Sequence, residues 1–340
     1  MKYIIKTAKK LLPVLCVIAG YGALMLLRRY KIVNPYMIQI LMFAGVNIMM
    51  TVSLNLVNGF TGQFCIGHAG FMSLGAYGSA IVTTLLFPGV ATSPALKIPA
   101  FLTGLFVGGV IAAVVGLLIG LPTLKLKGDY LAIVTLAFGE IVRAFLRLVE
   151  PIGAARGMVG IPAYTSIEWV LVFVVLTLFV ARSFIYSRYG RACIAIRDNE
   201  IAAGAMGINT TRYKIISFCT AAFMAGIAGG LFAHVMGFIQ PDTFSFVKSS
   251  DYLVYLYAGG VGTLTGSILG ALLLTILPEA LRFLASWRIV IYAVVLICVM
   301  LYRSNGLCGG KELGFLKIKR GTLYDEPFGN PKAVSEGGGR

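Results

Sequence analysis

The stretch Gly190–Asn209, GRACIAIRDNEIAAGAMGIN, gathers charge inside a sequence that is otherwise almost continuously apolar. Asp198 or Asn199 can cap a short helix that starts near Glu200, and Gly207–Asn209 can stop it. A short polar helix between two apolar spans cannot anchor itself in lipid, so we expect a partner in water to hold it. The candidate docking residues are Arg191, Arg197, Asp198, Asn199, Glu200, Ala203, Met206 and Gly207.

The composition around this stretch indicates an integral membrane protein. Of 340 residues, 58% are hydrophobic and only 12% are charged, whereas soluble domains carry about 25% charged residues. The apolar segments run for about 17 to 22 residues, which suits membrane helices. They do not show the alternation of membrane β-strands, which repeats over segments of about ten residues. We therefore predict an all-α, polytopic, multi-pass membrane protein.

Basic residues set the predicted orientation, because loops on the cytoplasmic side are enriched in Lys and Arg. We expect about ten spans with both ends in the cytoplasm. Residues 1–10 form a cytoplasmic N-terminus, 11–303 the transmembrane domain and 304–340 a basic cytoplasmic tail. Residues 187–212, here called the coupling segment, lie on the cytoplasmic side. The expected spans are about 11–27, 36–57, 63–87, 100–121, 130–149, 167–186, 213–236, 250–261, 266–284 and 289–302.

One feature argues against this topology, and an alternative count of the spans would change it. Arg28, Arg29 and Lys31 fall on the outer side, against the charge rule. Merging the eighth and ninth spans into one would also place the basic tail outside.

The net charge of +16 has two interpretations: the protein binds nucleic acid, or its basic residues contact lipid headgroups. The positive residues lie between spans, so we favour contact with anionic headgroups, and no nucleic-acid-binding fold remains once the spans are removed. The six cysteines are scattered without a CxxC pair, which is typical of small core residues and not of metal ligands or disulfides. The first apolar run lacks a small-residue cleavage site, so we expect no cleavable signal peptide.

Glycine-rich segments predict close helix packing and broken helices. Gly67, Gly70, Gly75 and Gly78 crowd one segment, and further glycines form GxxxG pairs in three spans. Two helix breaks, Asn58–Gly62 and Gly259–Thr263, each precede a glycine-rich helix. They fit an internal repeat of two halves, although repeated glycine also arises without one.

Three polar residues within the spans are candidates for a solute pathway: His68, Glu140 and Arg143. His68 either lines a path or packs in the core, and we favour packing. Glu140, Arg143 and Arg147 share one helical face and must be paired or wetted, because an unpaired charge in hydrocarbon is costly. An internal Glu140–Arg143 ion pair is the favoured alternative to a pathway.

Signatures of an enzyme are missing from the sequence. It has no HExxH and no G-x-S-x-G, and GLCGGK at 306–311 is one residue short of a phosphate loop and lacks its Ser or Thr. We therefore expect no catalytic, cofactor-binding or metal-binding residues. A partner or a gradient must supply any energy that the protein uses.

Four motifs in order resemble the LivM-type permease subunit of bacterial branched-chain amino acid ABC importers. They are NLVNGFTGQFCIGHAGFMSLGAYGSA, LKGDYLAIVTLAFGEIVR, GRACIAIRDNEIAAGAMGINTTRYK and AGGVGTLTGSILGALLLTILPEALR. The resemblance implies that 190–209 seats in a groove of an ATPase subunit that binds the ATP. It also implies a LivH-type sister permease, LivF- and LivG-type ATPases and an extracytoplasmic solute-binding protein as partners. The location that it implies is the bacterial cytoplasmic (inner) membrane.

Other functions stay open beside this one. Cys65 and Cys193 depart from the family's common pattern, and so does Ser304–Asn305, where a Pro-containing turn is usual. A permease of the same superfamily for urea, short amides or a sugar is the nearest alternative. A stand-alone channel would not need the coupling segment, and an intramembrane enzyme would need a catalytic constellation.

Overall fold

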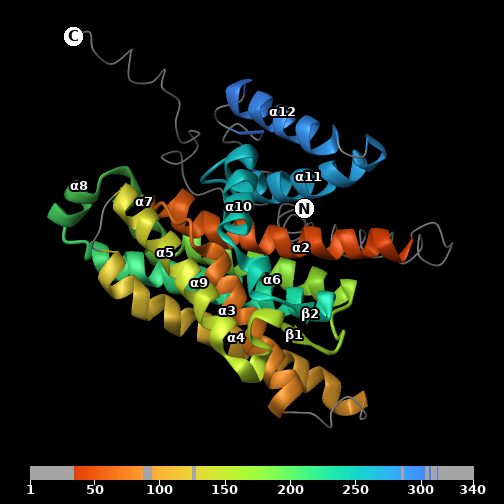
Figure 1. Ribbon diagram of the computed structural model, residues 1–340. Coiled ribbons are helices and arrows are strands. Elements are labelled where there is room, and N and C mark those ends of the chain that lie inside the picture. Colours follow the sequence, from red (N-terminus) through yellow and green to blue (C-terminus); the bar gives the residue numbers. More distant parts are fainter. Residues whose placement is uncertain are drawn as a thin grey trace, which may run out of the picture.

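The computed structural model describes residues 34–86, 94–124, 128–284, 287–302, 306–307 and 312 (Figure 1). The predicted cytoplasmic N-terminus, the first predicted span and most of the tail lie outside these residues. The helices are α2 (Pro35–Asn55), α3 (His68–Ile81), α4 (Pro94–Thr123), α5 (Asp129–Leu148), α6 (Ile167–Tyr186), α7 (Arg188–Asp198), α8 (Glu200–Ala205), α9 (Thr210–Met236), α10 (Phe246–Gly259), α11 (Leu264–Ala280) and α12 (Trp287–Tyr302).

Short irregular elements complete the fold. The π-helical turns Leu56–Phe60 and Val82–Leu86 prolong α2 and α3, and 3-10 turns cover Glu150–Ile152, Ala154–Arg156, Pro241–Phe244 and Arg282–Leu284. The strands β1 (Met158–Val159) and β2 (Phe238–Ile239) form an antiparallel pair, with Met158 opposite Ile239. Within the described residues this ribbon is the whole of the β-structure.

Five described helices are long and apolar enough to cross a membrane. They cover Pro35–Phe60, His68–Leu86, Leu96–Thr123, Ile167–Tyr186 and Thr210–Met236, and the shorter Leu264–Ala280 and Val290–Tyr302 are also apolar. This confirms the all-α polytopic class. The total of ten spans stays a prediction, because the first span lies outside the described part of the chain.

Two of the expected spans differ from a simple apolar helix. α5 has the length of a span, but Glu140, Arg143 and Arg147 charge one side of it. α10 has only 14 residues and crosses α2 steeply in Figure 1, whereas α11 runs along α2. Hydropathy predicts where these helices lie in the chain, but not how they are tilted.

Glycine brings the backbones of α3, α4 and α9 into contact. A Cβ at Gly75 would overlap the backbone of Gly226 on α9, and a Cβ at Gly108 on α4 would overlap the carbonyl of Gly75. In the same way α10 and α11 meet at Gly259 and Gly270. The predicted packing role of the glycine motifs is therefore confirmed for these two groups of helices.

The two predicted helix breaks lie side by side. Asn55, at the end of α2, donates from Nδ2 to the Thr263 carbonyl at 2.9 Å and to Ser267 Oγ at 2.8 Å. Its Oδ1 accepts the Gly262 N–H at 3.0 Å. Gly260 and Gly262 adopt positive φ angles of 125° and 76°, which glycine tolerates best. The internal repeat itself stays a prediction.

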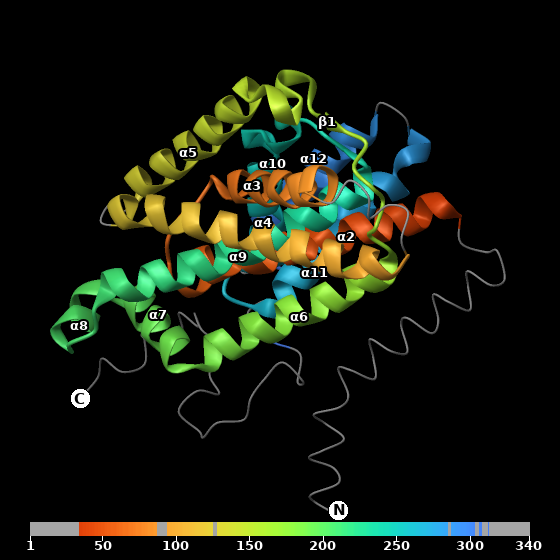
Figure 2. The ribbon, with the colours of Figure 1, turned by 90° about the horizontal axis from the view of Figure 1, so that it is seen from below.

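The molecule has two distinct ends. α7 and α8 project from one end, called here the coupling end, and the first residue of α2 lies at the opposite end in both views (Figure 1, Figure 2). α9 begins at the coupling end and α11 begins beside the helix breaks, so the last residues of both helices also lie at the opposite end.

Candidate coupling site

Three side-chain caps shape the coupling segment. Ser187 Oγ accepts the N–H groups of Tyr189 and Gly190 and starts α7. Asn199 Oδ1 accepts two backbone N–H groups in the first turn of α8, both at 3.0 Å. Asn209 Oδ1 accepts the Arg212 N–H at 3.1 Å and starts α9. Because each cap satisfies an N–H that the first helical turn leaves unpaired, the chain can turn sharply twice in about 20 residues.

The local prediction from sequence is correct for α8. Asn199, and not Asp198, is the cap, and the helix starts at Glu200. Gly207 follows the helix with φ of 83°. The sequence-based prediction did not include α7, a helix of 11 residues that Ser187 caps. Ser187 is the residue in the sequence that marks the start of this helix.

Arg197 fastens α7 to the bundle. Its Nη1 donates to the carbonyl of Gly59 at 3.0 Å, in the π-helical turn that follows α2. Nε and Nη2 donate to Asp198 Oδ1 at 3.0 Å and 2.9 Å. The side chain also lies against Gly62, whose φ is 72°. The coupling segment therefore contacts the first helix break directly.

Two further contacts of charged side chains hold the segment in place. Glu200 Oε1 pairs with Lys214 Nζ at 2.7 Å, and the Lys214 side chain is only 9% exposed. Arg191 Nη1 donates to the Tyr186 carbonyl at 3.1 Å. The first pair ties α8 to α9 and the second bond ties α7 to α6, so these charges orient the segment from within.

The exposed face of α8 is apolar. Ile201 is 79% exposed and Met206 is 84% exposed, and Gly204, Ala205 and Gly207 are exposed with them. Ala203 points the other way and is buried. Ile201 was not among the predicted docking residues. In a helix of six residues, the side chains that face outward depend on which residue caps the helix. Large apolar side chains held in water mark a surface that a protein partner covers.

Cys193 lies on the buried side of α7. Its Sγ lies 3.6 Å from the carbonyl of Tyr213, and its exposed area is 0%. Burial raises the pKa of the Cys193 thiol to about 11, although a hydrogen bond with Thr61 opposes the shift. The thiol therefore keeps its proton at neutral pH and behaves as a core residue.

His68 is buried at the start of α3. Its Nε2 lies 2.7 Å from Ser53 Oγ on α2, and the residue is 1% exposed. Its ring meets the ring of Phe71 edge-on. These contacts agree with the packing role that the sequence favoured.

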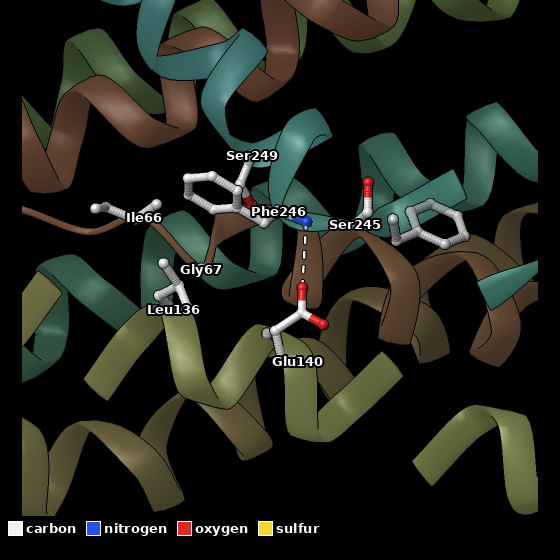
Figure 3. A pocket seen from close by; sticks show the side chains of 9 residues that line it. Ile66, Gly67, Leu136, Glu140, Ser245, Phe246 and Ser249 are labelled. Atoms are coloured by element: carbon white, nitrogen blue, oxygen red, sulfur yellow. Dashed lines mark hydrogen bonds between the residues drawn. The ribbon is translucent and has the colours of Figure 1, made fainter. Parts of the chain in front are cut away.

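Glu140 and Arg143 form the expected ion pair, at 2.5 Å. Glu140 Oε1 also accepts the Phe246 N–H of α10 at 3.3 Å (Figure 3). Arg147 pairs with Asp242. Glu140 and Arg147 on the charged face of α5 therefore both contact the segment that leads into α10. The cavity beside Glu140 measures about 10 Å³, which is room for about one water molecule and not for an amino acid.

No described group of three or more His, Cys, Asp or Glu side chains could hold a metal ion. The fold and the candidate site together define a polytopic membrane protein of α-helices that presents a short, capped helix with an exposed apolar face at one end. A family model described as "Branched-chain amino acid transport system / permease component" matches residues 36–302. The chain belongs to this family and is the permease subunit of an ABC importer.

Individual relatives agree with this placement. The high-affinity branched-chain amino acid transport system permease protein LivM of Escherichia coli is 32% identical over 314 residues, which cover 82% of this chain and 71% of LivM. LivH of Salmonella typhimurium is 25% identical over 300 residues, covering 80% and 96%. The autoinducer 2 import system permease protein LsrC of Photorhabdus luminescens is 30% identical over 157 residues, covering 44% and 47%. No solved structure matches the chain.

Proposed function

We propose that this subunit imports branched-chain or other hydrophobic amino acids across the bacterial inner membrane, driven by ATP that partner subunits bind and hydrolyse. The observation that carries the proposal is the exposed apolar face of α8, held rigidly by the cap at Asn199 and the Glu200–Lys214 pair. A rigid, preorganised helix loses little entropy when a partner's groove closes around it. The chain itself contributes no ATPase site.

The proposed partners follow from the same division of labour. A LivH-type sister permease completes the pathway, and LivF- and LivG-type ATPases receive the coupling segments. An extracytoplasmic solute-binding protein delivers the solute at the opposite end. The match to both LivM and LivH supports a pairing of two related permeases.

Another solute is the second candidate. The match to LsrC, a permease of an autoinducer 2 import system, favours a solute other than an amino acid. That match covers 44% of this chain, whereas the match to LivM covers 82%. The amino acid importer is therefore the better supported function.

The docking role is tested by replacing Ile201 and Met206 together with Ser. Both side chains are largely exposed, so the subunit folds and inserts normally. We expect the ATPase subunits to co-purify less and uptake of leucine to fall about tenfold or more, because the two anchors of the interface are gone. Val159→Ser is the matched control, since Val159 is 73% exposed at the opposite end. Undiminished ATPase binding in the double variant would refute the docking role.

A further inference from the structure

A cavity of about 500 Å³ lies between α2, the end of α9, α10 and α11. Its volume falls in the range of sites for small molecules, roughly 300–1,000 Å³. Its polar lining residues include Gln39, Asn47, Lys248, Tyr255, Thr275 and Glu279. Nothing in the coupling site uses this cavity.

The cavity occupies the half of the molecule away from the coupling end. Tyr36 at the start of α2 and Met236 at the end of α9 are exposed, whereas Asn47 and Tyr255 are buried. The exposed residues form a mouth at the opposite end and the buried ones form a floor about halfway along α2. A solute delivered by an extracytoplasmic protein would arrive at that mouth.

Lys248 brings a positive charge to the wall, and the nearby Asp251 stabilises it electrostatically without forming a direct ion pair. No described carboxylate oxygen lies within 4.0 Å of its ammonium group, and Asp251, one turn further along α10, is also outside that distance. The ring of Tyr252 lies 5.5 Å from Nζ. A half-buried ammonium in a polar cavity favours an anionic ligand, and a carboxylate matches it.

The same cavity offers acceptors for a positive group. Asn47 Nδ2 donates to Thr275 Oγ1 at 2.9 Å, which leaves Asn47 Oδ1 without a hydrogen bond to any described residue. Glu279, at the mouth, adds a carboxylate whose described partner is the exposed Arg282 at 3.3 Å. A ligand that carries both an ammonium and a carboxylate therefore finds groups of opposite sign on the walls.

The remaining wall is apolar. Phe43, Phe232, Met236 and Leu274 line it beside the polar residues. An aliphatic side chain buried there gains roughly 25 cal/mol for each Å² removed from water.

The geometry points to a receiving site for a zwitterionic amino acid with an apolar side chain, in which Lys248 binds the carboxylate. This inference rests on the proposed function and deepens it, because it assigns the solute a place in this subunit. The ammonium group of the solute is bound by Asn47 and Glu279, and its side chain packs on the aromatic wall.

The test uses the whole importer in proteoliposomes with saturating leucine-loaded binding protein. Lys248→Met is expected to lower the maximal rate of leucine uptake about tenfold or more, because the charge-assisted bond to the carboxylate is lost. Lys248→Arg keeps the charge and should retain most of the rate. Thermal stability and ATP hydrolysis without binding protein are expected to stay at wild-type levels, which a merely structural lysine would not allow.

Lys97→Met is the matched control, since Lys97 is half-buried on α4 and lies outside the cavity lining. A second variant, Met236→Cys, is to be modified with a bulky maleimide, which should block uptake by closing the mouth. Full uptake by Lys248→Met, or by modified Met236→Cys, overturns the site while leaving the proposed function intact. A wild-type importer that carries no amino acid would instead overturn the proposed function.

Discussion

Among single residues, Arg197 has the most consequential contacts. It bonds the carbonyl of Gly59 in the first helix break, and its Nη1 approaches Gly262 in the second. Asn55 joins the same two breaks from the other side. A movement of α7 therefore reaches α2, α10 and α11 through two side chains.

We predict that Arg197→Ala uncouples ATP hydrolysis from uptake. The carbonyl of Gly59 loses a charge-assisted hydrogen bond, which contributes about 1.5–3 kcal/mol. Uptake per ATP hydrolysed is expected to fall about tenfold or more in proteoliposomes, whereas ATP hydrolysis continues.

Arg188→Ala is the control, because it removes the same charge from an exposed position on α7. Wild-type uptake per ATP in the Arg197 variant would show that its bond to Gly59 does not transmit motion.

The sequence predicted the local chemistry of the coupling segment but not its long-range contacts. The cap at Asn199 depends on its immediate neighbours, so it was predictable. The partner of Arg197 lies 138 residues away, and no local pattern indicates it. The same applies to Ile201, whose exposure depends on how α8 rests on α9.

Among the helices, α3, α4 and α9 form the tightest group. The glycine motifs of the sequence predicted close packing, but not which helices would meet. The crossing of α10 over α2 was not predictable either, because hydropathy counts apolar residues and carries no information on tilt.

We predict that Gly75→Ala destabilises the protein. The added methyl group overlaps the backbone of Gly226, which cannot move as a side chain can. Overpacking of this kind costs about 1–3 kcal/mol or more. The measurement is thermal unfolding in detergent, where we expect a lower midpoint and a lower yield.

Gly204→Ala serves as the comparison, since a Cβ there meets no atom within 4 Å and its φ is not positive. Equal midpoints for the two variants would contradict the close backbone contact.

The two ends of the molecule differ, with the exposed apolar side chains of Ile201 and Met206 at one end and the cavity towards the other. Only α6 separates β1 from α7, so Val159 and Met206 should face opposite sides of the membrane. The class was predictable from the apolar runs, and the cytoplasmic orientation of the coupling segment, which rests on charge, stays a prediction. The cavity was not predictable, because its walls bring α2 against the later helices α9, α10 and α11, and Asn47 and Thr275, for example, are 228 residues apart.

We predict that Met206→Cys reacts with a membrane-impermeant maleimide only in inverted vesicles. Val159→Cys is expected to react only in spheroplasts. Both variants are made in a protein whose other cysteines, including the exposed Cys298, are replaced by Ser, except for the buried Cys193. Cys193 adds little background, because burial raises the pKa of its thiol to about 11 and the reactive thiolate is scarce at pH 7. Labelling of both positions from one side would disprove the orientation.

The glycine contacts mark two groups of helices that pack backbone against backbone. α3, α4 and α9 touch through main chain at Gly75, Gly108 and Gly226, and α10 and α11 do so at Gly259 and Gly270. Between the groups runs α2, which α11 meets through exchangeable side-chain bonds such as Asn47–Thr275. If the two groups move relative to each other, we expect the movement to follow the contacts along α2, which also lines the cavity that contains Lys248.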